Sequence, residues 1–180
     1  RPSLMRHQIR ALIRAADGRP LALMFPMITE VAEFDAARVL LDLEIDLAKS
    51  RGRPLPASLR VGTMLEVPAL AYQLTPLLAR VDFVSVGSND LFQFLFASDR
   101  GSPKLADRYD SLSPAAIAFL QNLVERCNAA GKPISLCGEM AGHPLDAMTL
   151  VGLGFRSLSM APSSLGPVKA MVRSLSVSEL

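Results

Sequence analysis

The stretch 81-VDFVSVGSNDLFQFLFA-97 shows how this chain is built. Its first part, 81-VDFVSVG-87, is a nearly continuous apolar run without polar alternation, which is typical of a strand in a parallel sheet covered on both faces. Its last part, 91-LFQFLFA-97, is predicted to be a helix. The stretch therefore predicts a buried strand that leads through the polar residues 88–90 into a helix.

Four other apolar runs repeat the pattern of this strand. They are 21-LALMFPM-27, 59-LRVGTMLEV-67, 134-ISLCGEM-140 and 157-SLSMAP-162. Helices are expected between and around the strands, over about residues 2–16, 30–51, 113–131 and 164–175. Strands that alternate with helices indicate an α/β fold with a parallel sheet, either a doubly wound sheet or a (β/α)8 barrel.

Polar residues at the ends of the predicted strands favour the barrel. Glu66 closes the second strand, Asn89 and Asp90 follow the third, and Cys137 lies near the end of the fourth. Chemistry at the carboxyl ends of several strands is typical of a (β/α)8 barrel. Five strands cannot close such a barrel, and the chain begins at Arg1 rather than methionine. We therefore expect residues 1–180 to form the last five β/α units, with the first three units upstream.

Composition excludes several classes of protein. The 180 residues are 50% hydrophobic and 20% charged, as in a globular domain. A net charge of +2, with scattered basic residues, indicates no nucleic-acid partner. No apolar run approaches the roughly 20 residues that span a bilayer, so we expect no membrane partner. Two cysteines, Cys127 and Cys137, cannot frame a disulfide scaffold, which favours a cytoplasmic protein.

Some apolar segments are expected to supply the core. Cys127 lies on the apolar stripe of the helix over residues 113–131 and is expected to be buried. Four methionines, Met5, Met24, Met27 and Met64, lie on segments predicted to be buried and are expected to fill the core.

Two carboxylates, Glu66 and Asp90, end buried strands. A charged group there is costly to desolvate unless it is paired or binds a metal ion. Two carboxylates on one rim, with room for water and substrate oxygens, suit Mg²⁺ or Mn²⁺. The alternative is that Glu66 pairs with a basic side chain and that Asp90 only caps the helix 91–97. Spacing alone does not choose between the two.

The longer string 82-DFVSVGSNDLFQFLFASDR-100 carries further binding groups. Gly87 permits a tight turn, and a helix that begins just after it presents free backbone N–H groups, which suit phosphate. Arg100 adds a planar fork that can hold phosphate or carboxylate. The whole string resembles the signature of PEP-utilising enzymes, D-x-x-S-x-G-[ST]-N-D-L-x-Q followed by D-R.

Three more stretches, 22-ALMFPMI-28, 62-GTMLEVPA-69 and 135-SLCGEMAG-142, resemble strand ends of enzyme I of the bacterial phosphotransferase system. The resemblance covers essentially the whole chain, and the stretches CGEMAG and 153-LGFRSLSM-160 are nearest to the nitrogen-related paralogue. The residues do not decide between sugar uptake and nitrogen regulation.

The resemblance implies a role for each candidate residue. Glu66 and Asp90 would ligate Mg²⁺, and Asn89 and Arg100 would hold the phosphoryl group of phosphoenolpyruvate (PEP). Cys137 would be the acid that protonates the enolate carbon to give pyruvate. The alternative for Cys137 is a small buried hydrophobe, the usual environment of a free cysteine.

The implied activity is that of a phosphoenolpyruvate-protein phosphotransferase. The phosphoryl group would pass to a histidine of the same enzyme and then to an HPr-type carrier protein. That histidine and several PEP-binding arginines belong to segments that this chain lacks. We therefore expect residues 1–180 alone to bind Mg²⁺–PEP weakly or not at all and to transfer nothing. A homodimer is expected.

Two other functions stay open. Pyruvate phosphate dikinase and PEP synthase share the barrel, but their cysteine loop reads more like CGEHGG, where this chain has Met140 and Ala141. A non-catalytic PEP-binding or dimerisation module is the second. The presence of Glu66, Asn89, Asp90, Arg100 and Cys137 together argues against a dead site.

Overall fold

The structure, a computed structural model, describes residues 1–102, 104–105 and 108–176. Its centre is a parallel sheet of five strands in the order β1-β2-β3-β4-β5. The strands are β1 (Leu21–Phe25), β2 (Leu59–Leu65), β3 (Val84–Gly87), β4 (Ile134–Cys137) and β5 (Leu158–Ser159).

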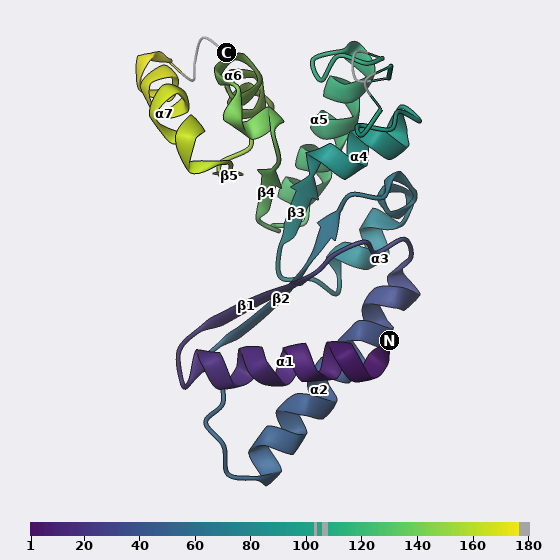
Figure 1. The fold of residues 1–180 in the computed structure, drawn as a ribbon, viewed down its shortest axis with the longest axis vertical. Coiled ribbons are helices and arrows are strands. Elements are labelled where there is room, and N and C mark those ends of the chain that lie inside the picture. The colour runs from purple at the N-terminus through teal and green to yellow at the C-terminus, as the bar shows by residue number, and fades with distance from the viewer. Residues whose placement is uncertain (103, 106–107, 177–180) are drawn as a thin grey trace.

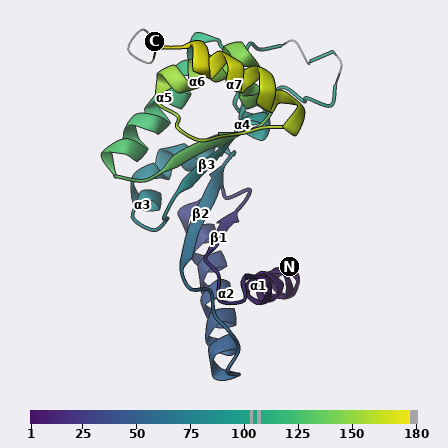
Figure 2. The same ribbon diagram turned by 90° about the vertical axis from the view of Figure 1, so that its left-hand side faces the viewer.

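Helices follow the strands along the chain. The α-helices are α1 (Pro2–Ala16), α2 (Val31–Ser50), α3 (Leu74–Leu78), α4 (Ser88–Leu95), α5 (Pro114–Ala129), α6 (Pro144–Leu153) and α7 (Leu165–Ser174). Short 3-10 helices are η1 (Pro68–Gln73), η2 (Met140–Gly142) and η3 (Pro162–Ser164). Both views show α1 and α2 at the β1 end of the sheet and α5, α6 and α7 toward the β5 end (Figures 1 and 2). Within the described ranges, no helix combines the length and the low charge needed to cross a bilayer.

The strand order distinguishes the two folds that alternating strands and helices allow. Each strand pairs with the next one along the chain, and the order never reverses. A doubly wound sheet reverses its order at a switch point, whereas a barrel does not. The predicted α/β fold, part of a (β/α)8 barrel, is therefore confirmed. Which units of the barrel these are stays a prediction.

Two element boundaries differ from the prediction in ways that matter for the site. Helix α4 begins at Ser88 rather than residue 91, so Asp90 lies in its first turn. The idea that Asp90 caps this helix from outside is wrong, because Gly87 occupies the N-cap position. Strand β1 ends at Phe25, before Pro26, and Met27 has a left-handed backbone with φ of 54°.

The core lies between the sheet and its helices. Its largest fully buried side chains include Phe34, Leu41, Leu65, Leu120 and Leu136.

The expectation for Cys127 is confirmed, and the one for two methionines is wrong. Cys127 is fully buried on α5, and this burial raises the pKa of its thiol to about 11. Met24 and Met27 are 36% and 51% exposed. They belong to β1 and the residues after it, and β1 pairs on one side only among the described strands.

Candidate functional site

The carboxyl ends of neighbouring strands form one polar rim. Gly87 at the end of β3 is the register partner of Cys137 at the end of β4, and Cys137 is in turn the partner of Ser159 in β5. Glu66 follows the last residue of β2, and its Oε2 atom lies beside Gly87. Because the strands are parallel and nearly level, the predicted site residues of three strands meet at the same edge.

Glu66 is a buried carboxylate with few partners. It is 4% exposed, and it accepts a hydrogen bond of 2.7 Å from the backbone N–H of Met27. None of the ion pairs among the described residues includes Glu66. The alternative that Glu66 pairs with a basic side chain therefore has no support in this part of the chain. A buried carboxylate without a cationic partner is costly to desolvate, which makes it a candidate metal ligand.

Gly87 lets Glu66 approach the end of β3 closely. A Cβ atom at this position would lie 2.9 Å from Glu66 Oε2 and 3.0 Å from the sulfur of Met64. The next residue, Ser88, is buried, and its hydroxyl donates a hydrogen bond of 3.0 Å to the carbonyl of Cys137. This bond ties the start of α4 to the end of β4, so the groups on the two elements keep a constant separation.

Asn89 is held by the loop after β4. The backbone N–H of Glu139 donates to Asn89 Oδ1 at 3.1 Å. Gly138 makes this approach possible, because its φ is 134° and a Cβ atom there would lie 2.8 Å from Asn89 Oδ1 and would overlap the hydroxyl of Ser88. With its side-chain oxygen engaged, Asn89 retains its NH₂ group as a donor for a ligand oxygen.

Cys137 and Asn89 line the same hollow. Its volume is about 340 Å³, and Gly138, Glu139 and Ser159 also border it. The thiol of Cys137 is half-buried, and the hydroxyl of Ser85 lies 3.9 Å from its sulfur. Unlike Cys127, Cys137 therefore lies where a small molecule can reach it, as a catalytic acid requires.

Asp90 and Arg100 form an ion pair at the same end of the sheet. Arg100 Nη2 lies 3.5 Å from Asp90 Oδ1, and the two side chains are 52% and 33% exposed. The backbone N–H of Arg100 also donates to Gln93 Oε1 at 3.3 Å. The chain beyond α4 thus folds back on the first turn of this helix. The described residues that border the hollow of Cys137 do not include Glu66, Asp90 or Arg100.

Tyr109 is a neighbour of the site that the sequence did not reveal. Its ring stacks on Phe96 with centroids 4.8 Å apart. Burial raises the pKa of Tyr109, the nearby Glu139 raises it further, and Arg100 opposes both. Tyr109 therefore lies among charged groups of the rim. The sequence also does not reveal the contacts of Ser85 and Ser88 with Cys137, because these contacts depend on the register between β3 and β4.

The donor set suits a hard divalent ion that keeps several water ligands. Glu66 and Asp90 offer carboxylate oxygens, the ligands that Mg²⁺ prefers. Within the described ranges, no three His, Cys, Asp or Glu side chains gather closely enough to enclose a metal ion.

The sequence matches a known family and a group of curated relatives. Residues 1–177 match the family described as PEP-utilising enzyme, PEP-binding domain. A "Multiphosphoryl transfer protein" of Xanthomonas campestris pv. campestris is 41% identical over 100% of this chain and 21% of its own length. A "Phosphoenolpyruvate-protein phosphotransferase" of Borreliella burgdorferi is 36% identical over 98% of this chain and 31% of its own length. The chain thus spans less than a third of these relatives.

A solved structure shows the same fold. The crystal structure of a citrate lyase from Burkholderia xenovorans LB400 superposes with a TM-score of 0.68 at 21% identity. The match covers 92% of this chain and 53% of the other. At this identity the likeness shows the fold alone.

Proposed function

We propose that this chain supplies part of the Mg²⁺–PEP site of a phosphoenolpyruvate-protein phosphotransferase. The premise is that it belongs to the PEP-utilising enzymes, whose PEP-binding domain its residues 1–177 match. The names of its relatives support this assignment. The observation that supports it most is that Asn89, the proposed phosphate-binding amide, and Cys137, the proposed acid, border one hollow.

The phosphoryl group would be held by Asn89, Arg100 and the start of α4. Helix α4 begins at Ser88, so its free backbone N–H groups and its positive dipole end face the rim. The NH₂ group of Asn89 and the guanidinium of Arg100 add donors for phosphate oxygens. Phosphoryl transfer depends mainly on positioning and on neutralising negative charge, which these groups supply.

Glu66 and Asp90 would hold the divalent ion. When bound, Mg²⁺ would neutralise charge on the phosphoryl and enolate oxygens as the phosphorus–oxygen bond breaks. Glu66 is buried, and the backbone N–H of Met27 orients its carboxylate.

Cys137 would supply the proton that completes pyruvate. When the bond between phosphorus and the bridging oxygen breaks, the electron pair stays on that oxygen and an enolate forms. The enolate carbon then takes the proton of the Cys137 thiol, and the thiolate regains a proton from solvent. A thiol is an acid suited to this transfer near neutral pH.

The rest of the reaction is proposed from the resemblance. The phosphoryl group would pass to a histidine of the same enzyme outside residues 1–180, and from there to an HPr-type carrier protein. We place the enzyme in the cytoplasm and expect it to be a homodimer.

Binding of PEP in the presence of Mg²⁺ tests the proposal. In the intact protein, Glu66→Gln and Asp90→Asn should each weaken PEP binding by about tenfold or more, because each removes a charged contact worth roughly 1.5–3 kcal/mol. Titration calorimetry at fixed Mg²⁺ measures the affinity. Asp42→Asn, on the exposed face of α2 beside Arg38, is the matched control and should bind like the parent. Unchanged affinity in both site variants would refute the assignment.

A further inference from the structure

A charged pocket lies toward the amino ends of the strands, away from the rim at their carboxyl ends. It has a volume of about 190 Å³ and lies between α1 and α2. Residues 17–20 and 51–58 lead from these two helices to the amino ends of β1 and β2. The pocket borders Asp17 and Arg53 in these segments, so it faces away from the carboxyl ends that carry the proposed PEP site.

One carboxylate in this pocket, that of Glu44, already accepts hydrogen bonds from two arginines. Glu44 is 1% exposed and accepts hydrogen bonds from Arg6 at 2.6 Å and from Arg10 at 2.9 and 3.0 Å. The side-chain hydrogen bond from Arg10 is the main reason that the pKa of Glu44 falls to about 2, and the bond from Arg6 lowers it further. Glu44 therefore stays ionised, and its single charge is shared by two guanidinium groups.

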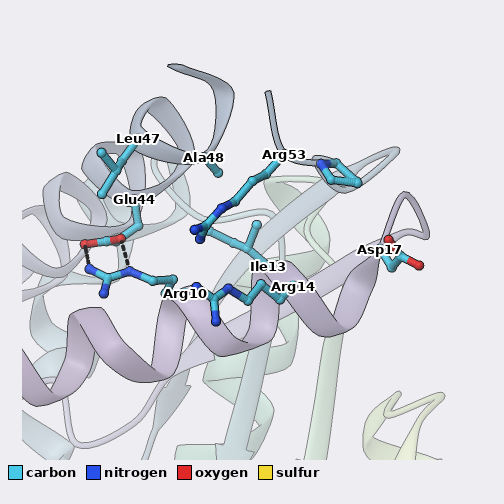
Figure 3. A pocket seen from close by; sticks show the side chains of 9 residues that line it. Arg10, Ile13, Arg14, Asp17, Glu44, Leu47, Ala48 and Arg53 are labelled. Atoms are coloured by element: carbon cyan, nitrogen blue, oxygen red, sulfur yellow. Dashed lines mark hydrogen bonds and ion pairs between the residues drawn. The ribbon is translucent and has the colours of Figure 1, made fainter. Parts of the chain in front are cut away.

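Two more guanidinium groups enter the same pocket without a partner. Figure 3 shows Arg14 and Arg53 turned toward the side of the pocket that Arg10 occupies, whereas Asp17 lies apart at the end of α1. In the part of the chain that the structure describes, neither Arg14 nor Arg53 makes a side-chain hydrogen bond or ion pair.

The helix ends do not account for these two arginines. The last carbonyls of α1, those of Ala15 and Ala16, accept hydrogen bonds from the side chain of Arg19. At the end of α2, the carbonyl of Ala48 accepts from the backbone N–H groups of Arg51 and Arg53. The side chains of Arg14 and Arg53 are thus not needed to satisfy the helix termini.

The pocket is therefore left with excess positive charge. Three guanidinium groups, those of Arg10, Arg14 and Arg53, border it with two carboxylates, those of Glu44 and Asp17, and Arg6 adds a fourth positive charge by pairing with Glu44. Like charges held close together repel one another, and a bound anion relieves this repulsion. A phosphate monoester carries about −1.5 to −2 charges near pH 7, which matches the excess.

We propose that this pocket binds the phosphate group of a small phosphorylated metabolite. The unpaired forks of Arg14 and Arg53 would each donate to phosphate oxygens, the geometry for which arginine is suited. Apolar side chains of Ile13, Leu47 and Pro54 border the same pocket and would contact the carbon part of the ligand. The ligand would bridge α1 and α2 at a distance from the proposed PEP site, which makes the pocket a candidate regulatory site.

Titration calorimetry with inorganic phosphate and with glycerol phosphate tests the proposal. The intact protein is used with Arg100→Gln, so that phosphate binding at the rim is weakened while this pocket stays unaltered. We expect both probes to bind, and the double variant Arg14→Gln, Arg53→Gln to lose at least about tenfold in affinity, as removal of charged hydrogen bonds does. Circular dichroism checks that the double variant folds. The matched variant Arg14→Lys, Arg53→Lys keeps the charges without the planar guanidinium groups and should bind with intermediate affinity.

Arg38→Gln is the charge-matched control, because Arg38 lies on the exposed face of α2 and pairs with Asp42. Three results would overturn the proposal: equal affinity in the double glutamine variant, an equal loss in Arg38→Gln, or tighter binding of the dicarboxylate succinate than of glycerol phosphate. Unchanged PEP binding in the rim variants, with phosphate still bound at this pocket, would refute the rim assignment only.

Discussion

Cys127 and Cys137 lie close together in the sequence but in different surroundings. Cys127 is fully buried on α5 and its pKa is raised to about 11 by burial, so it is a poor proton donor at neutral pH. Cys137 ends β4, is half-buried and borders the hollow that Asn89 also lines. At the scale of single residues, access to this hollow is what separates a candidate acid from a core residue.

This difference predicts the effect of replacing each thiol. In the intact protein, Cys137→Ser should slow pyruvate formation by about 10²–10⁴-fold, the usual contribution of a positioned acid, because a hydroxyl is a much weaker acid than a thiol. Binding of Mg²⁺–PEP should be nearly unchanged. The rate of pyruvate formation is measured with a lactate dehydrogenase coupled assay. Deuterium uptake at the methyl carbon of pyruvate reports the protonation step.

Cys127→Ser is the matched control for this experiment. It places the same hydroxyl in the core, so it should lower stability without changing the deuterium uptake per turnover. A normal rate of protonation in Cys137→Ser would remove Cys137 from the mechanism.

At the scale of elements, α1 and α2 are joined by a buried ionic contact rather than by apolar packing alone. Glu44 on α2 accepts hydrogen bonds from Arg6 and Arg10 on α1. Ile9 and Ile13 of α1 are buried in the core beside this contact. Breaking a buried carboxylate–arginine contact from one side leaves unpaired charge, which is more costly than losing an exposed pair.

The contact predicts how stability depends on pH. The pKa of Glu44 is lowered from 4.5 to about 2 on folding, so its stabilising effect is complete above pH 4.5 and is lost as the pH falls toward 2. Glu44→Gln should lower the free energy of unfolding at pH 7 by about 1–2 kcal/mol, because the arginines left behind are 40% and 29% exposed, and should reduce the loss of stability below pH 4.5. Urea unfolding between pH 7 and pH 2.5 measures both effects.

Asp42→Asn provides the comparison on the same helix. Asp42 pairs with Arg38 at 2.9 Å on the exposed face of α2, and such pairs contribute about 0.5 kcal/mol. If the free energy of unfolding falls as steeply with decreasing pH in Glu44→Gln as in the parent, other carboxylates govern the loss of stability in acid.

At the scale of the whole molecule, the sheet has an open edge at β1. Strand β1 pairs only with β2 among the described strands. Exposed apolar side chains of Leu4, Leu12 and Met24 line a groove of about 420 Å³ between this strand and α1. An unpaired strand beside apolar surface is a template for association with another chain.

We therefore expect the 180-residue chain to self-associate. Sedimentation velocity should show a dimer or larger species whose fraction grows with concentration, and Leu12→Glu with Met24→Lys should shift it toward the monomer. Leu145→Lys, an exposed apolar position on α6, is the control and should leave the distribution unchanged. A compact monomer at all concentrations would refute this prediction.

Most of the fold and of the site could be predicted from local signals. Helices α1, α2, α5 and α7 lie within a residue or two of their predicted bounds, because caps and apolar stripes are local features. Asn89, Asp90 and Arg100 were recognised as parts of one string, and the structure brings Asp90 and Arg100 into contact. Contacts that depend on strand register, such as those of Ser85 and Ser88 with Cys137, could not be read in this way.

The sequence by itself determined the alternation of strands and helices and the kinds of residue at the strand ends, because apolar periodicity and strand-end chemistry are properties of neighbouring residues. Only the tertiary structure decided between the two possible sheets, left Glu66 without a cationic partner among the described residues, and gathered Arg10, Arg14 and Arg53 around one pocket. Those outcomes depend on which distant segments pack together, and packing between distant segments leaves no periodic trace in the chain.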